Sequence, residues 1–158
     1  MNPHGTRAVQ KLIENLRSEE LINSFVKILR PHIISLIKDI NGNHIIQKFL
    51  SQIEGPQSVI VYETIIENTI EISTHKHGCC VLQKCIENAK ENMKESMIDK
   101  IIACTFDLIV DQYGNYVVQY ILSLGNLDYN KRIIMTLLNH IIYLSKQKYS
   151  SNVVEKVK

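Results

Sequence analysis

The side chains best suited to recognition chemistry lie in residues 111–122, DQYGNYVVQYIL. Asn115 and Gln119 are four residues apart, so on a helix their amides share one face, with Tyr116 beside them. Amides both donate and accept hydrogen bonds, and aromatic rings stack, so this face, if exposed as we expect, suits a planar polar ligand. The opposite face is apolar and comprises Val117, Val118, Ile121 and Leu122.

The same arrangement recurs along the chain. Landmark residues follow one another at intervals of 37, 36, 36 and 36 residues, at Gly5, Gly42, Gly78, Gly114 and Ser150. Apolar pairs repeat in the same register, as Ala8/Val9, Ile45/Ile46, Val81/Leu82, Val117/Val118 and Val153/Val154. A fixed period of roughly 20–50 residues is typical of a solenoid. Because the apolar spacing within each unit is helical, the sequence predicts an array of helical repeats.

Each landmark is followed by a short polar motif. The motifs are Thr6-Arg7-x-x-Gln10, Asn43-His44-x-x-Gln47, Cys79-Cys80-x-x-Gln83, Asn115-Tyr116-x-x-Gln119 and Ser151-Asn152-x-x-Glu155. Over essentially the whole chain, this set resembles the Pumilio (PUF) family of RNA-binding proteins. The resemblance implies an all-α, right-handed solenoid of about 36-residue repeats with the motif helices on a concave face. The expected units within residues 1–158 are a partial repeat at 1–36, repeats at 37–72, 73–108 and 109–144, and a partial repeat at 145–158.

The resemblance also implies a role for each motif position, because such repeats read one base each. The first and fifth positions contact the base edge; these are Thr6, Gln10, Asn43, Gln47, Cys79, Gln83, Asn115, Gln119, Ser151 and Glu155. The second position stacks on the base ring; these residues are Arg7, His44, Cys80, Tyr116 and Asn152. Cys80 and Asn152 depart from the flat group that stacking requires.

Hydrogen-bonding capacity then predicts the bases. Two amides match the mixed edge of uracil, and a carboxylate, which only accepts, matches the two N–H donors of guanine. The family pattern associates a small first residue and Gln, as in Cys79/Gln83, with adenine, and Thr6/Gln10 is expected to take adenine too. Because the RNA of the family runs antiparallel to the protein, we expect 5′-GUAUA-3′, with the guanine at Ser151/Glu155.

A lysine follows the fifth motif position in four of the five motifs, at Lys11, Lys48, Lys84 and Lys156, whereas Tyr120 takes this place in the fourth motif. The formal net charge is only +2, so bulk charge does not indicate nucleic acid. A row of lysines in register with the amides does indicate nucleic acid, and it predicts contacts with RNA phosphates.

The function implied by the resemblance is sequence-specific binding of single-stranded RNA in 3′ untranslated regions, with repression of translation and control of mRNA stability. We expect a cytoplasmic monomer, with protein co-repressors on the convex face. Two alternatives are an armadillo- or HEAT-like solenoid that binds proteins, and a nucleolar PUF-like protein that binds structured RNA. A peptide-binding solenoid has no reason to repeat an amide pair in register, and the nucleolar relatives tend to lose the base-reading motifs.

Other classes of function lack support in the sequence. No run of 18 apolar residues predicts a membrane span, and the first residues lack the apolar stretch of a signal peptide. His75, His77, Cys79 and Cys80 are close in sequence but lack the spacing of a zinc site, so no metal or other cofactor is expected. Neither a phosphate-binding glycine loop nor a nucleophile motif predicts an enzyme. The four cysteines fit reduced thiols.

The positions of proline, glycine and capping residues also predict where helices begin and end. Pro31 should end a helix near residue 29, residues 57–72 should form one long helix with Ile70 inward, and Asp128 should cap a helix at 129–144. Gly125 should close the fourth motif helix. Because both ends cut through repeats, we expect a fragment of a longer domain, with Val153, Val154 and Val157 half exposed.

Overall fold

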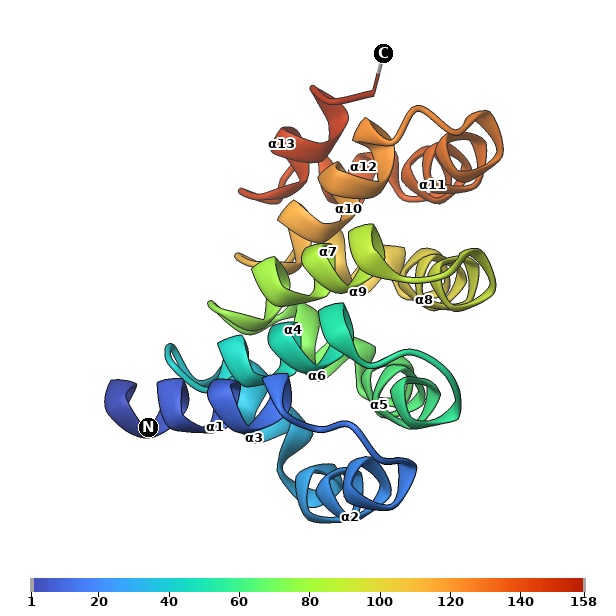
Figure 1. Ribbon diagram of the computed structural model, residues 1–158. Coiled ribbons are helices and arrows are strands. Elements are labelled where there is room, and N and C mark those ends of the chain that lie inside the picture. Colours follow the sequence, from blue (N-terminus) through green and yellow to red (C-terminus); the bar gives the residue numbers. More distant parts are fainter. Residues whose placement is uncertain (1, 158) are drawn as a thin grey trace.

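The computed structural model describes residues 2–157, so the outermost positions of the expected domain, 1 and 158, lie outside the described residues. Within this range all regular structure is helical (Figure 1). The helices are α1 (Pro3–Glu14), α2 (Glu19–Leu29), η1 (Arg30–His32), α3 (Ile33–Lys38), α4 (Asn43–Gln52), α5 (Pro56–Glu67), α6 (Thr69–Ser73), α7 (Gly78–Asn88), α8 (Glu91–Ala103), α9 (Thr105–Ile109), α10 (Gly114–Ser123), α11 (Leu127–Asn139), α12 (Ile141–Leu144) and α13 (Ser150–Val154). The predicted fold class, an all-α right-handed solenoid, is confirmed.

The helices form three rows along the stack (Figure 1). The motif helices α1, α4, α7, α10 and α13 make one row, in which each packs on the next. The long helices α2, α5, α8 and α11 form the opposite row, called here the outer row. The short helices α3, α6, α9 and α12 form the third row, and α3, α6 and α9 each contact helices of both other rows. Along the chain, an outer helix is followed by a short helix and then by a motif helix.

One backbone bend recurs between each outer helix and the short helix after it. It falls on residues with φ between −125° and −103°, which are His32, Asn68, Cys104 and His140. These positions are 36 residues apart. The conformation is open to any L-residue, so no glycine or proline is needed there. The bend lets the short helix turn its own apolar residues into the core.

This bend corrects two predicted helices. Residues 57–72 form α5 and α6, which meet at Asn68, and residues 129–144 form α11 and α12, which meet at His140. The apolar period crosses both bends without interruption, so the pattern cannot reveal them. Ile70, expected to point inward, is 44% exposed for the same reason.

Side chains cap the starts of a few helices, and proline and glycine mark some of the ends. The Ser18 side chain caps α2, and α2 ends at Leu29, ahead of Pro31, as predicted. Gly125, with φ of 71°, follows α10 as predicted. The predicted cap at Asp128 is wrong, because the Asn126 side chain accepts hydrogen bonds from the backbone N–H groups of residues 128 and 129.

The core lies between the rows and is filled by the repeated apolar pairs. Fully or nearly fully buried members include Ile45, Ile46, Val81, Leu82, Val117, Val118 and Val153. Val153 was expected to be half exposed, but it is completely buried because α13 packs on α10. Val154 is 42% exposed and Val157 is partly buried, as predicted for them. Every motif helix is thus fixed by its neighbours in the row.

Two of the landmark glycines, Gly78 and Gly114, allow the motif helix to approach the short helix. A Cβ atom on Gly78 would lie 2.3 Å from the backbone carbonyl oxygen of Ile72, and one on Gly114 would lie 2.9 Å from that of Leu108. Both distances are too short for carbon and oxygen atoms. In the last repeat Ser150 takes this place, and its hydroxyl donates a hydrogen bond to the equivalent carbonyl, of Leu144.

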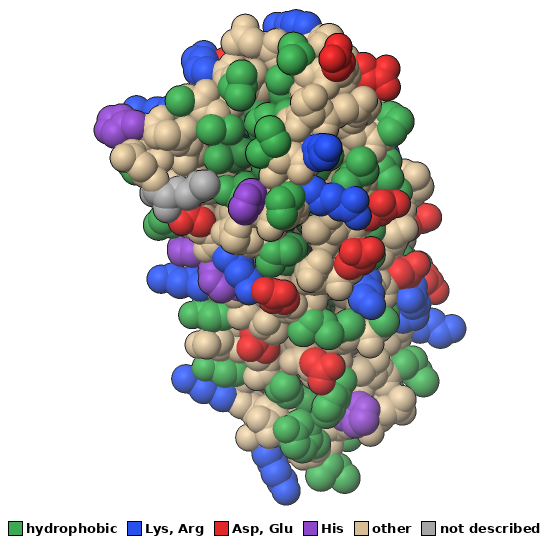
Figure 2. All heavy atoms as spheres, turned by 90° about the horizontal axis from the view of Figure 1, so that it is seen from below, with side chains coloured by type: hydrophobic (Ala, Val, Ile, Leu, Met, Phe, Trp, Pro, Cys, Tyr) green, Lys and Arg blue, Asp and Glu red, His purple; other side chains and the backbone are tan. Residues whose placement is uncertain are grey.

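Apolar side chains are exposed at both ends of the stack. Figure 2 views the molecule from the α1–α2 end and shows hydrophobic side chains among charged ones across that surface. Leu21 and Ile28 of α2 are more than half exposed, as are Leu138 of α11 and Ile142 of α12. No helix within residues 2–157 is long and apolar enough to cross a membrane.

Candidate nucleic-acid interface

The predicted recognition residues come together on the motif row. The five motif helices lie side by side, so the motif positions of successive repeats follow one another along one face, called here the motif face (Figure 1). The second-position side chains are all exposed on it; they are Arg7, His44, Cys80, Tyr116 and Asn152. Each is thus accessible to a ligand. Their roles toward RNA stay predictions.

An acidic side chain fixes the start of two motif helices. The carboxylate of Asp111 accepts hydrogen bonds from the backbone N–H groups of Tyr113, at 2.8 Å, and Gly114, at 2.7 Å. Asp39 does the same for Asn41 and Gly42. In the third repeat His75 takes this place, and its Nδ1 accepts the equivalent bonds at 3.3 and 3.4 Å. These contacts satisfy N–H groups that a helix start leaves unpaired.

Buried amides lie below the motif face in the two Asn repeats. Asn115 is 0% exposed and its Nδ2 donates hydrogen bonds to the carbonyl oxygens of Asp111, at 2.8 Å, and Gln112, at 3.1 Å. Its Oδ1 accepts a bond of 2.9 Å from Nε2 of Gln119. Asn43 and Gln47 repeat this arrangement, with a bond of 2.7 Å.

The expectation that the first-position amides are exposed is therefore wrong for both Asn residues. Their amide hydrogens are occupied by the preceding turn, where the backbone carbonyls need partners. What remains for a ligand is the partly exposed Gln amide, with one oxygen and one N–H. The Asn residues fix the orientation of the Gln residues, whatever further contacts they make.

The third repeat presents thiols instead of a first-position amide. Cys79 is 3% exposed, and burial, with a smaller effect of Cys80, raises the pKa of its thiol to about 12. The thiol is therefore neutral at physiological pH. The Sγ atoms of Cys79 and Cys80 are 3.9 Å apart, and Cys80 is exposed. This repeat offers a small neutral surface beside Gln83, which differs chemically from the amide repeats.

Hollows follow one another along the motif face. One of about 480 Å³ lies between α7 and α10 and is lined by Cys79, Cys80, Gln83, Tyr116, Gln119, Tyr120, Ser123 and Lys156. A second of about 450 Å³ is lined by Gln10, His44, Gln47, Lys48, Ser51, Lys84, Glu87 and Asn88. A third of about 230 Å³ is lined by Arg7, Gln10, Lys11, Glu14 and Lys48. The motif side chains of neighbouring repeats thus share open hollows.

The predicted lysine row is present on this face, but its members differ in their environment. Lys11 and Lys48 are both paired with Glu14, at 2.8 and 2.9 Å. Lys84 and Lys156 are exposed, and within residues 2–157 neither has an ion-pair partner. The lysine pattern alone did not reveal this difference. It depends on Glu14, which lies four residues after Gln10 and therefore on the same helix face.

The motif at the C-terminal end differs in its first position. Ser151 is exposed, and so is Glu155. The Ser151 hydroxyl donates a hydrogen bond of 3.1 Å to the carbonyl oxygen of Lys148, and no bond joins the two motif side chains within residues 2–157. The carboxylate is therefore available as an acceptor.

The candidate metal ligands His75, His77, Cys79 and Cys80 do not form a site within residues 2–157. Within the described range no group of three metal-ligating side chains comes together.

These features define a class of protein, a helical-repeat solenoid that carries one set of motif side chains per repeat along one face. The Pumilio-family RNA binding repeat matches the chain over residues 1–23, 32–66, 68–102, 104–138 and 140–157. The chain belongs to the Pumilio (PUF) family. The repeat limits predicted at residues 37, 73, 109 and 145 stay a prediction.

Relatives and solved structures agree with this membership. A Pumilio domain-containing protein of Schizosaccharomyces pombe is 42% identical over 98% of this chain, and Pumilio homolog 12 of Arabidopsis thaliana is 39% identical over 97%. The Puf4 RNA binding domain bound to a 3′ UTR recognition sequence of HO endonuclease RNA matches 98% of the chain with a TM-score of 0.86 and 42% identity. The RNA-binding domain of yeast Puf5p bound to SMX2 RNA matches 99% with a TM-score of 0.84 and 37% identity.

The chain covers only part of each of these proteins. It spans 23% of the S. pombe protein and 26% of the A. thaliana protein, and it covers 49% of the Puf4 chain and 46% of the Puf5p chain. The similarity thus concerns the repeat domain, and roughly half of it.

Proposed function

We propose that this protein binds single-stranded RNA on its motif face, reads 5′-GUAUA-3′ with its five motifs, and represses mRNAs that carry such an element in the 3′ untranslated region. The observation that supports this most is the row of five recognition sets in register on neighbouring helices. The Puf4 and Puf5p domains, which share this fold and 42% and 37% of its sequence, were solved with RNA bound.

The buried Asn residues refine the proposed contact with uracil. Uracil presents an N3–H donor between two carbonyl acceptors. The free Oε1 of Gln119 accepts from N3–H, and its remaining N–H donates to a neighbouring carbonyl oxygen of the base. Asn115, by accepting from the other N–H of Gln119, holds the amide in that orientation. Tyr116, 52% exposed beside them, stacks on the ring. Gln47, Asn43 and His44 repeat the arrangement.

The third and fifth motifs supply the contrast. The neutral thiol of Cys79 adds no strong hydrogen-bonding group beside Gln83. The Gln83 amide alone can then serve the edge of adenine, which needs one donor and one acceptor. Glu155 offers only acceptors, which suits the two adjacent N–H donors of guanine. The five contacts then give 5′-GUAUA-3′, read from the C-terminal motif.

Replacing Glu155 by Gln tests the proposal. The amide adds a donor and removes the charge at nearly constant volume, so preference should move from guanine toward adenine, at a cost for guanine of roughly 1–3 kcal/mol. The measurement is the dissociation constant of both proteins for labelled RNAs containing GUAUA or AUAUA between uridines. An RNA containing GUCUA is the control, since both proteins should disfavour it equally. Equal preference of the two proteins for GUAUA over AUAUA would refute the assignment of Glu155.

The cellular part of the proposal has its own measurements. A reporter mRNA with GUAUA elements in its 3′ untranslated region should be repressed by the wild-type protein and released by a variant lacking the Gln119 amide. Cytoplasmic location, a monomeric state and protein co-repressors on the outer row of helices belong to the same proposal. Light scattering on the purified protein measures its molar mass in solution and so tests the monomeric state directly.

A further inference from the structure

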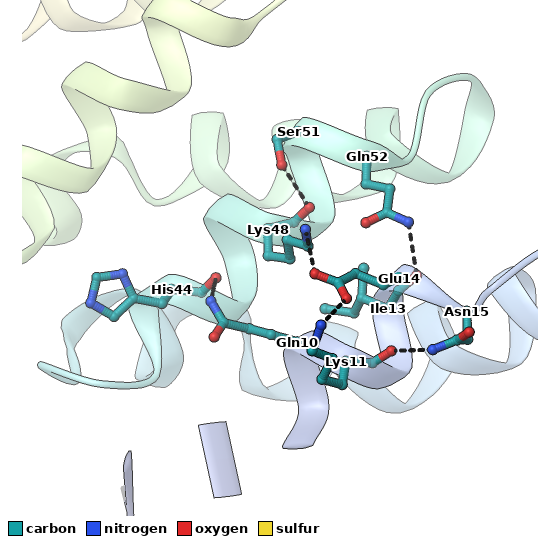
Figure 3. A network of polar contacts seen from close by, with 9 residues as sticks. All are labelled: Gln10, Lys11, Ile13, Glu14, Asn15, His44, Lys48, Ser51 and Gln52. Atoms are coloured by element: carbon teal, nitrogen blue, oxygen red, sulfur yellow. Dashed lines mark hydrogen bonds and ion pairs between the residues drawn. The ribbon is translucent and has the colours of Figure 1, made fainter. Parts of the chain in front are cut away.

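A single carboxylate holds two of the four lysines of the motif face. Glu14 of α1 directs its Oε2 at the ammonium group of Lys11, at 2.8 Å, and its Oε1 at that of Lys48 on α4, at 2.9 Å. Figure 3 shows the carboxylate lying between the two ammonium groups. An anion with two oxygen atoms thus bridges two neighbouring motif helices, as a phosphate group of a bound RNA strand would.

The bridge forms because of the register of the repeats. The residue four positions after the motif Gln faces the lysine position of the next repeat, and in successive repeats it is Glu14, Ser51, Glu87 and Ser123. Ser51 lines the same hollow as Lys84, and Ser123 lines the same hollow as Lys156. Glu87 faces Tyr120, whose pKa it raises together with burial, the larger cause. Glu14 is therefore the member of this row that meets lysine.

Ser51 and Ser123, which take the place of Glu14 in later repeats, form no equivalent bridge to a lysine within the described residues. The hydroxyls of Ser51 and Ser123 donate to carbonyl oxygens of their own helices, at 2.9 and 2.6 Å, and within residues 2–157 neither is hydrogen-bonded to Lys84 or Lys156. The pKa of Glu14 is lowered to about 2 by its hydrogen bonds with Lys11 and Lys48, so the carboxylate stays charged at physiological pH.

We propose that Glu14 competes with an RNA phosphate for Lys11 and Lys48, so that the N-terminal end of the motif face contributes weaker backbone binding than the end carrying Lys84 and Lys156. This inference rests on the RNA binding proposed above. An incoming phosphate must displace the carboxylate from both ammonium groups before it gains their contacts. The lysine row thus divides into a restrained part and a free part.

Replacing Glu14 by Gln frees both lysines, whereas the matched replacement of Glu87 by Gln removes the same charge from the same row beside a tyrosine. The probes are labelled RNAs containing GUAUA and an oligouridine of equal length, measured over a salt titration. The Glu14→Gln protein should bind both RNAs about two- to fivefold more tightly, the range expected of exposed ion pairs. For this variant, the slope of log K for RNA binding against log salt concentration should become steeper by roughly 0.7 per added phosphate contact.

Glu87→Gln should leave the salt dependence unchanged, and combining Glu14→Gln with Lys48→Ala should remove most of the gain. Because exposed ion pairs contribute little to stability, Glu14→Gln should keep the wild-type circular dichroism spectrum. Equal effects of the two Glu variants would indicate general charge alone and overturn the inference, as would no effect of either. A wild-type protein that binds neither RNA at low salt would instead refute the proposed function itself, and this inference with it.

Discussion

Asn115 gives the sharpest test of whether a motif side chain contacts the RNA base itself or only holds a neighbouring side chain in place. The perturbation is Asn115→Ala, with Gln119→Ala as its partner. Asn115 is completely buried and makes three side-chain hydrogen bonds, two to backbone carbonyls and one to Gln119. Gln119 is partly exposed, and the bond of its side chain is the one to Asn115.

The magnitudes follow from these contacts. A net contribution of about 1 kcal/mol per intramolecular hydrogen bond gives about 3 kcal/mol for Asn115, and the small cavity left by alanine adds to it. The free energy of unfolding should therefore fall by about 2–4 kcal/mol. Gln119→Ala removes one of the same bonds at the surface, so it should cost no more than about 1 kcal/mol.

Urea unfolding followed by circular dichroism measures both variants, and RNA binding below the transition gives the second readout. Asn115→Ala should lose stability and relax the base preference at its repeat, because Gln119 is no longer held. Gln119→Ala should lose the base preference with little change in unfolding. If Asn115→Ala unfolds like the wild type and only weakens RNA binding, Asn115 is a direct reader and the positioning argument is wrong.

Two further predictions concern close packing and buried thiols. Gly78→Ala should destabilise the protein by about 1–3 kcal/mol in urea unfolding, because its Cβ would lie 2.3 Å from a backbone carbonyl oxygen, whereas Gly5→Ala, with nothing within 4 Å, should be neutral or stabilising. Burial raises the pKa of the thiols of Cys79 and Cys85 to about 12, so the folded protein binds more protons than the unfolded chain above about pH 9, and stability should fall as pH rises from 9 toward 12. Iodoacetamide at pH 8 should label the exposed Cys80 first; equal labelling of Cys79 in the folded protein, or a urea midpoint that does not fall with rising pH, would contradict the burial assigned to these thiols.

The sequence alone determined the repeat and the face on which the motif positions lie, whereas the role of each motif residue toward RNA stays a prediction. A 36-residue period with apolar pairs in register indicates a stack of helices that buries most of these pairs, and residues at fixed motif positions then share one surface. The end of the fourth motif helix at Gly125 was equally predictable, because glycine readily adopts the positive φ found there.

Only the tertiary structure decided which of these side chains are accessible and which are already paired. Asn115 lies in the motif like Tyr116, yet the preceding turn takes its amide hydrogens, because buried carbonyl groups need partners. The bend at Asn68 leaves no mark in the pattern, since its backbone conformation suits any residue. Glu14 is an ordinary helix residue in the sequence. It bridges Lys11 and Lys48 because the stacking of two repeats brings a second helix within reach, and periodicity within a single helix carries no information about such a contact.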